Sequence, residues 1–234
     1  MKIDEVCILS KQQQILKLQY PSKRWNEIWF FGGIEIYDDT SSDMLVVNKT
    51  KGFLTEGDVQ FLWDLASSLP KNGTYLEIGS WMGLSTILTA NALLANLNLG
   101  AKIFAVDLWD YTEEFKNYDA VKNGNLYDIF IENVKRSNME HFIVPIRGKS
   151  SEIIRHIDEM FDLIFIDGDH TFEGVYSDID LAFSKVKSGG RVLGHDADDI
   201  TGVKEAVIKF AEDNKYNYKI YEPPTTYYIW EIYP

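Results

Sequence analysis

The stretch Thr74-Tyr-Leu-Glu-Ile-Gly-Ser-Trp-Met-Gly-Leu-Ser85 determines how the rest of the chain can be interpreted. It begins with strand-forming residues, turns between Gly79 and Gly83, and continues into the apolar, helix-like pattern of residues 84–97. Gly79 can adopt backbone angles that other residues avoid, and Gly83 allows a ligand or a neighbouring strand to approach closely. Such a turn predicts a cofactor pocket at the carboxyl end of a strand, although the glycines alone fit an ordinary strand-to-helix turn equally well.

The composition indicates one globular domain. The chain has 234 residues, of which 45% are hydrophobic, enough for one sizeable core. Its formal net charge of -13 offers no basic surface to a nucleic-acid backbone or an anionic membrane. Cys7 is the only cysteine, so no internal disulfide can form. Because no apolar run approaches the length of a membrane span and the N-terminus lacks a signal pattern, we expect a cytoplasmic protein that binds neither nucleic acid nor membranes.

From Thr74 onward, strand patterns alternate with helix patterns. The apolar runs at 103–106 and 163–166 are continuous, which is typical of parallel strands buried on both faces. The C-terminal residues predict two strands joined by a tight turn, a link too short for anything but an antiparallel pair. We expect strands at 75–78, 102–107, 142–147, 161–167, 190–194, 218–221 and 225–233, and helices at 55–69, 84–97, within 118–137, and at 151–156, 175–187 and 202–213. The pattern predicts an α/β fold: a doubly wound (Rossmann-like), mostly parallel seven-stranded sheet with an antiparallel C-terminal strand and helices on both faces.

The first 53 residues show no clear periodicity. Four aromatic residues, Trp25, Trp29, Phe30 and Phe31, lie close to a Gly-Gly pair at 32–33. Aromatic residues at this density more often cover a core edge or a subunit contact than bind a ligand, and beside a cofactor they could also form a lid. We therefore divide the chain into an N-terminal extension at 1–53, serving as a lid or a homo-oligomer contact, and a core domain at 54–234.

Polar residues or glycines follow each of the five predicted parallel strands. They are Glu77 and Gly79, then Asp107, then residues 147–150, then residues 167–170, then His195 and Asp196. Because the carboxyl ends of parallel strands meet at one edge of the sheet, we expect a ligand site there. At this edge Asp107 suits acceptance of hydrogen bonds from two ribose hydroxyls, and the alternative is that it caps the following helix.

Four stretches, 77–85, 106–107, 161–170 and 189–196, together resemble class I S-adenosylmethionine-dependent methyltransferases. More narrowly, they resemble macrocin-type sugar O-methyltransferases and relatives of cephalosporin hydroxylase, over roughly Leu54 to the C-terminus. The resemblance implies S-adenosyl-L-methionine as cofactor. It assigns Glu77 and Gly79 to the methionine part, Ser80 to Gly83 to its amino acid end, Asp107 to the ribose, and Leu108 and the turn from Gly148 to Ser150 to the adenine. Ser85 and Asp167 are further cofactor-binding residues that the resemblance implies.

The resemblance also implies a divalent metal, because Asp167 and Asp196 fall where metal-using relatives place magnesium ligands. Two carboxylates plus substrate oxygens suit Mg²⁺. This sequence departs from those relatives, which often carry two adjacent acids or an acid–amide pair at the second position. Here His195 and Ala197 flank Asp196. A metal site and a pair of hydrogen-bonded structural acids are both compatible with the sequence.

His170 is our first choice for a general base, since histidine titrates near neutrality and this position holds the catalytic histidine in some sugar methyltransferases of the group. Asp169 is second, because other relatives place the base there. The structural alternative is that His170 caps the helix that follows it. The aromatic and acidic segment 109–119 could be a lid over the acceptor or a solvated loop.

These observations predict an O-methyltransferase that acts on a hydroxyl of a small polar acceptor such as a sugar, a glycoside or another natural product. A nicotinamide-dependent oxidoreductase is disfavoured, because the glycines are spaced Gly-x-x-x-Gly and no Tyr-x-x-x-Lys pair follows the fourth strand. Two competing hypotheses stay open: a non-catalytic assembly protein that keeps the methyltransferase fold, and an oxidation of the kind associated with cephalosporin hydroxylase.

Overall fold

The computed structural model describes residues 29–31, 34–39, 44–47, 49–110, 125–199, 202–223 and 226–233. The burial of side chains is described from residue 49 onward. The expectations for the aromatic side chains before residue 49 and for most of segment 109–119 lie outside these residues.

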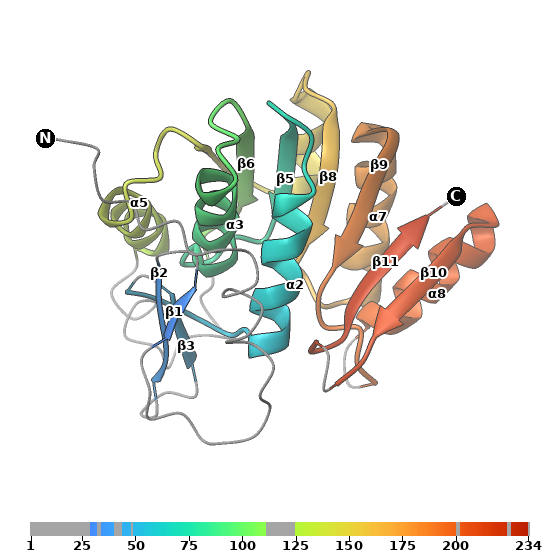
Figure 1. The fold of residues 1–234 in the computed structure, drawn as a ribbon. Coiled ribbons are helices and arrows are strands. Elements are labelled where there is room, and N and C mark those ends of the chain that lie inside the picture. The colour runs from blue at the N-terminus through green and yellow to red at the C-terminus, as the bar shows by residue number, and fades with distance from the viewer. Residues whose placement is uncertain are drawn as a thin grey trace, which may run out of the picture.

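A seven-stranded mixed sheet forms the centre of the fold, in the order β10-β11-β9-β8-β5-β6-β7 (Figure 1). Its strands are β5 (Thr74–Ile78), β6 (Lys102–Asp107), β7 (Ile143–Arg147), β8 (Phe161–Ile166), β9 (Val186–Gly194), β10 (Asn217–Tyr221) and β11 (Ile229–Tyr233). The pairs among β5 to β9 are parallel, whereas β11 runs antiparallel to both β9 and β10. The predicted fold class is therefore confirmed.

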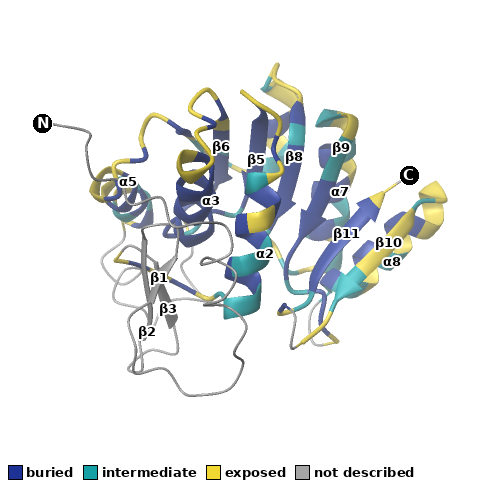
Figure 2. Ribbon diagram, in the orientation of Figure 1, coloured by how far each residue is buried: buried dark blue, intermediate teal, exposed yellow. Residues whose placement is uncertain are grey.

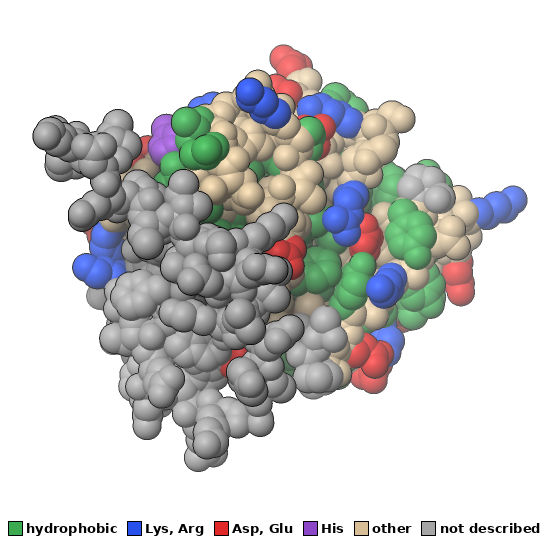
Figure 3. All heavy atoms as spheres, in the orientation of Figure 1, with side chains coloured by type: hydrophobic (Ala, Val, Ile, Leu, Met, Phe, Trp, Pro, Cys, Tyr) green, Lys and Arg blue, Asp and Glu red, His purple; other side chains and the backbone are tan. Residues whose placement is uncertain are grey.

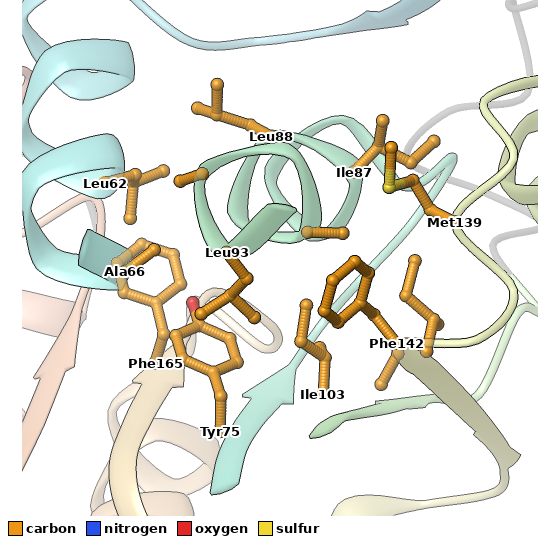
Figure 4. Packing of buried hydrophobic residues seen from close by; sticks show 14 of the residues in the cluster. Leu62, Ala66, Tyr75, Ile87, Leu88, Leu93, Ile103, Met139, Phe142 and Phe165 are labelled. Atoms are coloured by element: carbon orange, nitrogen blue, oxygen red, sulfur yellow. The ribbon is translucent and has the colours of Figure 1, made fainter. Parts of the chain in front are cut away.

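Helices cover both faces of this sheet (Figures 1 and 2). They are α2 (Glu56–Ser67), α3 (Leu84–Ala95), α5 (Leu126–Arg136), α6 (Ser150–Ile153) with a 3-10 turn η1 (Ile154–His156), α7 (Phe172–Lys185) and α8 (Val203–Asn214). One core cluster joins α2, α3 and α5 to strand residues such as Tyr75 and Phe165, and Figure 4 shows this packing. A second cluster joins α6, α7 and α8 to the alternate strand residues, such as Leu76 and Ile164. Neighbouring residues on one strand are thus buried on opposite faces, which explains the continuous apolar runs.

Both ends of helix α7 differ from the expectation. Helix α7 begins at Phe172 rather than at residue 175, because the Thr171 hydroxyl accepts a hydrogen bond from the Gly174 N–H and caps the helix there. At its other end α7 passes directly into β9 at Val186, so this strand is longer than the predicted 190–194.

The predicted tight turn between the last two strands is wrong. They pair antiparallel as expected, but the link runs over residues 222–228, and β11 begins at Ile229 rather than at residue 225. The Thr226 hydroxyl donates to the Tyr221 carbonyl, and the Tyr227 N–H donates to the Asp58 carboxylate on α2. These contacts fix the end of the link before β11 starts.

The sequence did not predict a second, four-stranded antiparallel sheet. It has the order β1-β2-β3-β4 and consists of β1 (Trp29–Phe31), β2 (Ile34–Asp39), β3 (Met44–Val47) and β4 (Thr50–Gly52). Its strands β3 and β4 contact α3 (Figure 1). This sheet leads directly into Phe53 and Leu54, which border the site described below.

The described surface carries charges of both signs. On the face that Figure 3 shows, Lys and Arg side chains are spread over several elements, with acidic side chains between them. No helix in the described part of the chain is long and apolar enough to cross a membrane.

Candidate functional site

Two cavities lie at the carboxyl ends of the parallel strands, where the sequence predicted a ligand site. The first, of about 410 Å³, is lined by Gly52, Phe53, Leu54, Thr55, Asp58, Gly79, Ser80, Trp81, Leu84, Ser85, Asp167, Gly168, His170, His195, Asp196 and Tyr227. The second, of about 600 Å³, is lined by Ile78, Gly79, Val106, Asp107, Leu108, Asp110, Gly148, Lys149, Ser150, Ser151, Gly168, Asp169, His170, Thr171, Glu173, Gly174, Ser177 and Asp178. Gly79, Gly168 and His170 line both, so the cavities adjoin at these residues.

Gly79 is required at the junction by its conformation and by its surroundings. Its φ is +89°, and a Cβ placed there would lie 2.0 Å from the Asp167 carbonyl oxygen and 2.6 Å from the Gly168 Cα. The Gly79 N–H also donates to the Val106 carbonyl at 2.9 Å. Because any side chain would collide with the backbone after β8, only glycine lets the ends of β5, β6 and β8 approach this closely.

Gly83 has a structural position rather than a place in either cavity. It is the N-cap of α3 with φ +91°, and a Cβ there would lie 3.0 Å from the Phe130 ring on α5. The second glycine of the turn thus allows the helix to start and α5 to pack against it.

Glu77 lies beneath the turn and is fully buried. Its Oε2 accepts hydrogen bonds from the hydroxyls of Ser80, at 3.0 Å, and Thr86. Burial raises the pKa of Glu77 to about 7, against the lowering effect of the Ser85, Thr86 and Ser80 hydroxyls. Its Oε1 has no hydrogen-bond partner of normal geometry among the described residues. Glu77 lines neither cavity, and Ser80 and Ser85 above it line the first.

The Asp107 carboxylate organises the same turn from the end of β6. Its Oδ2 accepts the backbone N–H groups of Ser80 and Trp81, each at 2.8 Å, and its Oδ1 accepts that of Trp109 at 2.6 Å. Asp107 is 4% exposed and lines the second cavity. Asp107 therefore holds the glycine turn through backbone hydrogen bonds, and its assignment to a ribose stays a prediction.

A chain of alternating acids and histidines runs along the first cavity. Asp58 Oδ2 lies 3.4 Å from His195 Nε2, His195 Nδ1 lies 3.0 Å from Asp196 Oδ1, and Asp196 Oδ2 lies 3.3 Å from His170 Nε2. Asp58 is fully buried and His195 is 5% exposed, so the chain connects the protein interior to the junction of the cavities. Asp58 also completes a capping box with Thr55 and accepts the Tyr227 N–H at 2.7 Å.

The charges of Asp58, His195 and Asp196 stabilise one another. Burial opposes ionisation of His195, but the neighbouring carboxylates of Asp196 and Asp58 overcome it and raise the pKa of His195 well above its usual value. Burial raises the pKa of Asp196, but the neighbouring His170 and His195 lower it by more, so the pKa of Asp196 lies below its usual value. The structure thus favours an imidazolium at His195 between two carboxylates.

Asp167 follows β8 beside this chain. Burial raises the pKa of Asp167 to about 6, with the His195 charge opposing the rise and Asp196 adding to it. Asp167, His170 and Asp196 each offer a ligand atom within 4.8 Å of the others. Two carboxylates and an imidazole form a donor set for a cation with mixed oxygen and nitrogen preference, and only the carboxylates suit Mg²⁺.

The structure brings together most of the predicted site residues. Those in the first cavity are Gly79, Ser80, Ser85, Asp167, His170 and Asp196, and those in the second are Gly79, Asp107, Leu108, Gly148, Ser150, Asp169 and His170. Glu77 and Gly83 support the turn from outside the cavities. His170 is half-buried, and Asp169 is exposed and accepts the Thr171 N–H at 2.8 Å.

Sequence reasoning missed several cavity residues, namely Phe53, Asp58, Asp178 and Tyr227. Two left a signal. Asp58 is the third residue of a helix that Thr55 caps, and Asp178 interrupts the apolar face formed by Val175, Ile179 and Ala182. Neither signal predicts which residues, distant in the sequence, Asp58 and Asp178 contact.

Known proteins share the sequence and fold of this region. A sequence model of a family described as a methyltransferase domain matches residues 76–197, just over half of the chain. Uncharacterized protein R132 of Acanthamoeba polyphaga mimivirus is 29% identical over 140 residues, which span 59% of this chain and 58% of that protein. The match thus covers little more than half of this relative's length.

Two solved structures share the fold. The O-methyltransferase from Bacillus cereus in complex with SAH matches with a TM-score of 0.57 at 18% identity, over 78% of this chain and 83% of that one. The O-methyltransferase TomG from Streptomyces achromogenes, involved in tomaymycin synthesis and solved in complex with SAM, matches with a TM-score of 0.56 at 14% identity, over 77% of this chain and 80% of that one.

Proposed function

Because the chain belongs to the family of S-adenosylmethionine-dependent methyltransferase domains, we propose that it transfers a methyl group to a hydroxyl of a small polar acceptor. The observation that carries this proposal is the pair of cavities that adjoin at Gly79, Gly168 and His170. Methyl transfer needs a donor and an acceptor in contact at one point, with the rest of each molecule held apart.

The second cavity suits the adenosine part of the cofactor. Asp107 and Leu108 lie at the end of β6, and Gly148 and Ser150 lie after β7, as the resemblance to methyltransferases implies. Leu108 is 49% exposed, so an apolar side chain is available to cover a purine ring. The methionine part then follows Gly79 towards Ser80 and Ser85, above Glu77.

The part of the first cavity beyond Ser80 and Ser85 suits the acceptor. Its walls include Phe53, which stacks on Trp81 with ring centroids 5.4 Å apart, and Tyr227. Asp58, His195, Asp196 and His170 also line this cavity. Rings beside hydrogen-bonding groups suit a sugar or another cyclic acceptor whose hydroxyl reaches His170. Phe53 immediately follows the small sheet, which supports a lid role for residues 1–53.

S-adenosylmethionine, when bound, supplies an electrophilic methyl group, and transfer is an in-line displacement in which the O–C bond forms as the S–C bond breaks. The chain contributes position and a base. His170 stands at the junction and takes the hydroxyl proton, and the Asp196 carboxylate 3.3 Å from its Nε2 stabilises the imidazolium that results. Asp169 is the alternative base, but it is exposed and bonded to the Thr171 N–H.

A divalent metal is a separate part of the proposal. Asp167 and Asp196 would hold it and would orient an acceptor oxygen. Both oxygens of Asp196 already face imidazole nitrogens, so a metal would compete with His170 or His195. Titration of the protein with Mg²⁺ and Mn²⁺, with Asp199→Asn as an exposed control acid, tests this part: equal binding by the control and by Asp196→Asn would contradict a site at Asp196.

Calorimetric titration with S-adenosylhomocysteine and NAD tests the cofactor. We expect binding of the first and none of the second, and failure of a folded sample to bind S-adenosylhomocysteine would refute the proposal. Incubation with labelled S-adenosylmethionine and a panel of sugars, glycosides and phenols then tests the acceptor. Cofactor binding without transfer to any acceptor would favour a non-catalytic assembly protein.

A further inference from the structure

We propose that Asp178 on α7 determines the base specificity of the cofactor site by accepting a hydrogen bond from the 6-amino group of adenine. The inference rests on the proposed cofactor and adds a residue that the resemblance to methyltransferases did not supply. It concerns the second cavity alone.

Asp178 is the buried acid on the α7 side of that cavity. It is 4% exposed, and it lines the space that the ligand would fill. Its Oδ1 accepts the Ser150 hydroxyl at 2.6 Å, and within the described chain its Oδ2 accepts no hydrogen bond. This oxygen is not among the fully buried side-chain atoms that lack a partner, so it is open to the cavity, where a ligand donor can reach it.

The other polar side chains of the cavity do not select an amino group. Lys149 lines the cavity with an ammonium group, which only donates and therefore favours a carbonyl oxygen. Ser151 and Ser177 line it with hydroxyls, which rotate to donate or to accept and therefore tolerate an amino group or a carbonyl alike. The acids Asp110, Asp169 and Glu173 also line it but are exposed and remain solvated, and Asp107 already accepts three backbone N–H groups.

The position of Asp178 fits the purine end of the cofactor. Ser150, its partner, belongs to the turn after β7 that also contains Gly148. The Asp107 carboxylate lies at the ribose end, at the end of β6. Burial raises the pKa of Asp178 to about 6, opposed by the Ser150 hydrogen bond, so the carboxylate form prevails at pH 7.5. An ionised carboxyl group can only accept, which favours an amino group and disfavours a carbonyl oxygen.

The test compares S-adenosylhomocysteine with S-inosylhomocysteine, which differs by a 6-oxo group in place of the 6-amino group. We expect calorimetry at pH 7.5 to show roughly tenfold to a hundredfold tighter binding of the adenosyl compound by the full chain, the range for a lost charge-assisted hydrogen bond and an opposed carbonyl. Equal affinities for the two compounds would overturn the inference without touching the proposed function.

Asp178→Asn extends the test, because an amide can donate to the 6-oxo group. We expect the preference to shrink to about threefold or less, or to reverse, with a circular dichroism spectrum like that of the wild type. Asp180→Asn, on the same helix but exposed, should keep the wild-type ratio. An unchanged ratio in Asp178→Asn refutes the assignment.

The comparison remains decisive if Asp178→Asn does not fold, because the wild-type ratio alone can refute the inference. Ser150→Ala then serves as the second variant. It removes the partner of Oδ1 but keeps the carboxylate, so a preference for the adenosyl compound should persist, and its loss would assign the discrimination to Ser150 instead. Failure of the wild type to bind S-adenosylhomocysteine at all would refute the proposed function and this inference together.

Discussion

Replacement of Glu77 by Gln should change how the stability of the protein depends on pH. Glu77 is fully buried beneath the glycine turn, and burial raises its pKa from 4.5 to about 7 in the folded protein. A carboxyl group with a raised folded-state pKa binds its proton more tightly when the chain is folded. Its favourable contribution is therefore complete below pH 4.5 and is lost as the pH rises through 7.

The size of the effect follows from these two pKa values. Between pH 5.5 and pH 8.5 the unfolded chain is almost fully ionised at Glu77, whereas the folded chain changes from mostly protonated to mostly ionised. Linkage then lowers the free energy of unfolding of the wild type by about 2 kcal/mol over this range through Glu77 alone. Glu77→Gln cannot ionise but keeps the shape, and the Ser80 and Thr86 hydroxyls can still bond to its amide.

Urea unfolding at pH 5.5, 6.5, 7.5 and 8.5 measures this contribution, and the range stays above the sequence pI of 4.7. Taking the difference between wild type and Glu77→Gln at each pH removes the titration of the other groups. We expect Glu77→Gln to gain about 2 kcal/mol relative to the wild type from the lowest to the highest pH, while the exposed-acid control Glu140→Gln stays parallel to the wild type. A difference that is constant within about 0.5 kcal/mol would show that Glu77 titrates normally and that its burial does not control its ionisation.

Three further outcomes test the site. Gly79→Ala should lower the free energy of unfolding by more than about 3 kcal/mol and abolish binding of S-adenosylhomocysteine, since its Cβ meets the backbone after β8, whereas Gly189→Ala, with φ +78° and open space, should cost only about 1–2 kcal/mol in urea unfolding. Asp107→Asn should lose about 1–3 kcal/mol of stability as well as cofactor affinity, and unchanged stability in urea unfolding would contradict the three backbone hydrogen bonds. His170→Ala should bind S-adenosylhomocysteine like the wild type while methyl transfer falls by about a hundredfold or more, and His156→Ala, which is exposed and lines neither cavity, should leave both unchanged.

The central sheet could be predicted from the sequence because the signals for it are local. Continuous apolar runs such as 103–106 come from strands that are covered on both faces, and Ala105 and Val106 show this directly, because they belong to different core clusters. Parallel strands also bring their carboxyl ends to one edge, so Asp107, Asp167 and Asp196 could be assigned to one rim from their places after the strands. The order of the strands and helices along the chain was sufficient to assign these acids to one edge of the sheet, without knowledge of any side-chain contact.

The contacts within the rim could not be predicted, because each joins residues far apart in the sequence. Asp58 forms a capping box with Thr55, a local pattern, yet its other oxygen accepts the N–H of Tyr227 from the opposite end of the chain. The strands of the small sheet are only 3 to 6 residues long, and such short strands leave little periodicity to recognise. The link before β11 was misjudged for the same reason, since its path depends on Asp58.

The connection between Asp58, His195 and Asp196 bears on whether the site needs a metal. A metal-dependent methyltransferase would use the charge of a cation to neutralise Asp167 and Asp196 and to orient the acceptor oxygen. In this chain an imidazole already lies between Asp58 and Asp196, and the surrounding carboxylates favour its protonated form. One positive charge is therefore supplied by the protein itself, at the position where the sequence departs from metal-using relatives. Because Asp58 also caps α2 and binds the loop before β11, the charge of His195 is held by two segments that line the first cavity, next to the Asp196 carboxylate that contacts His170, the proposed base.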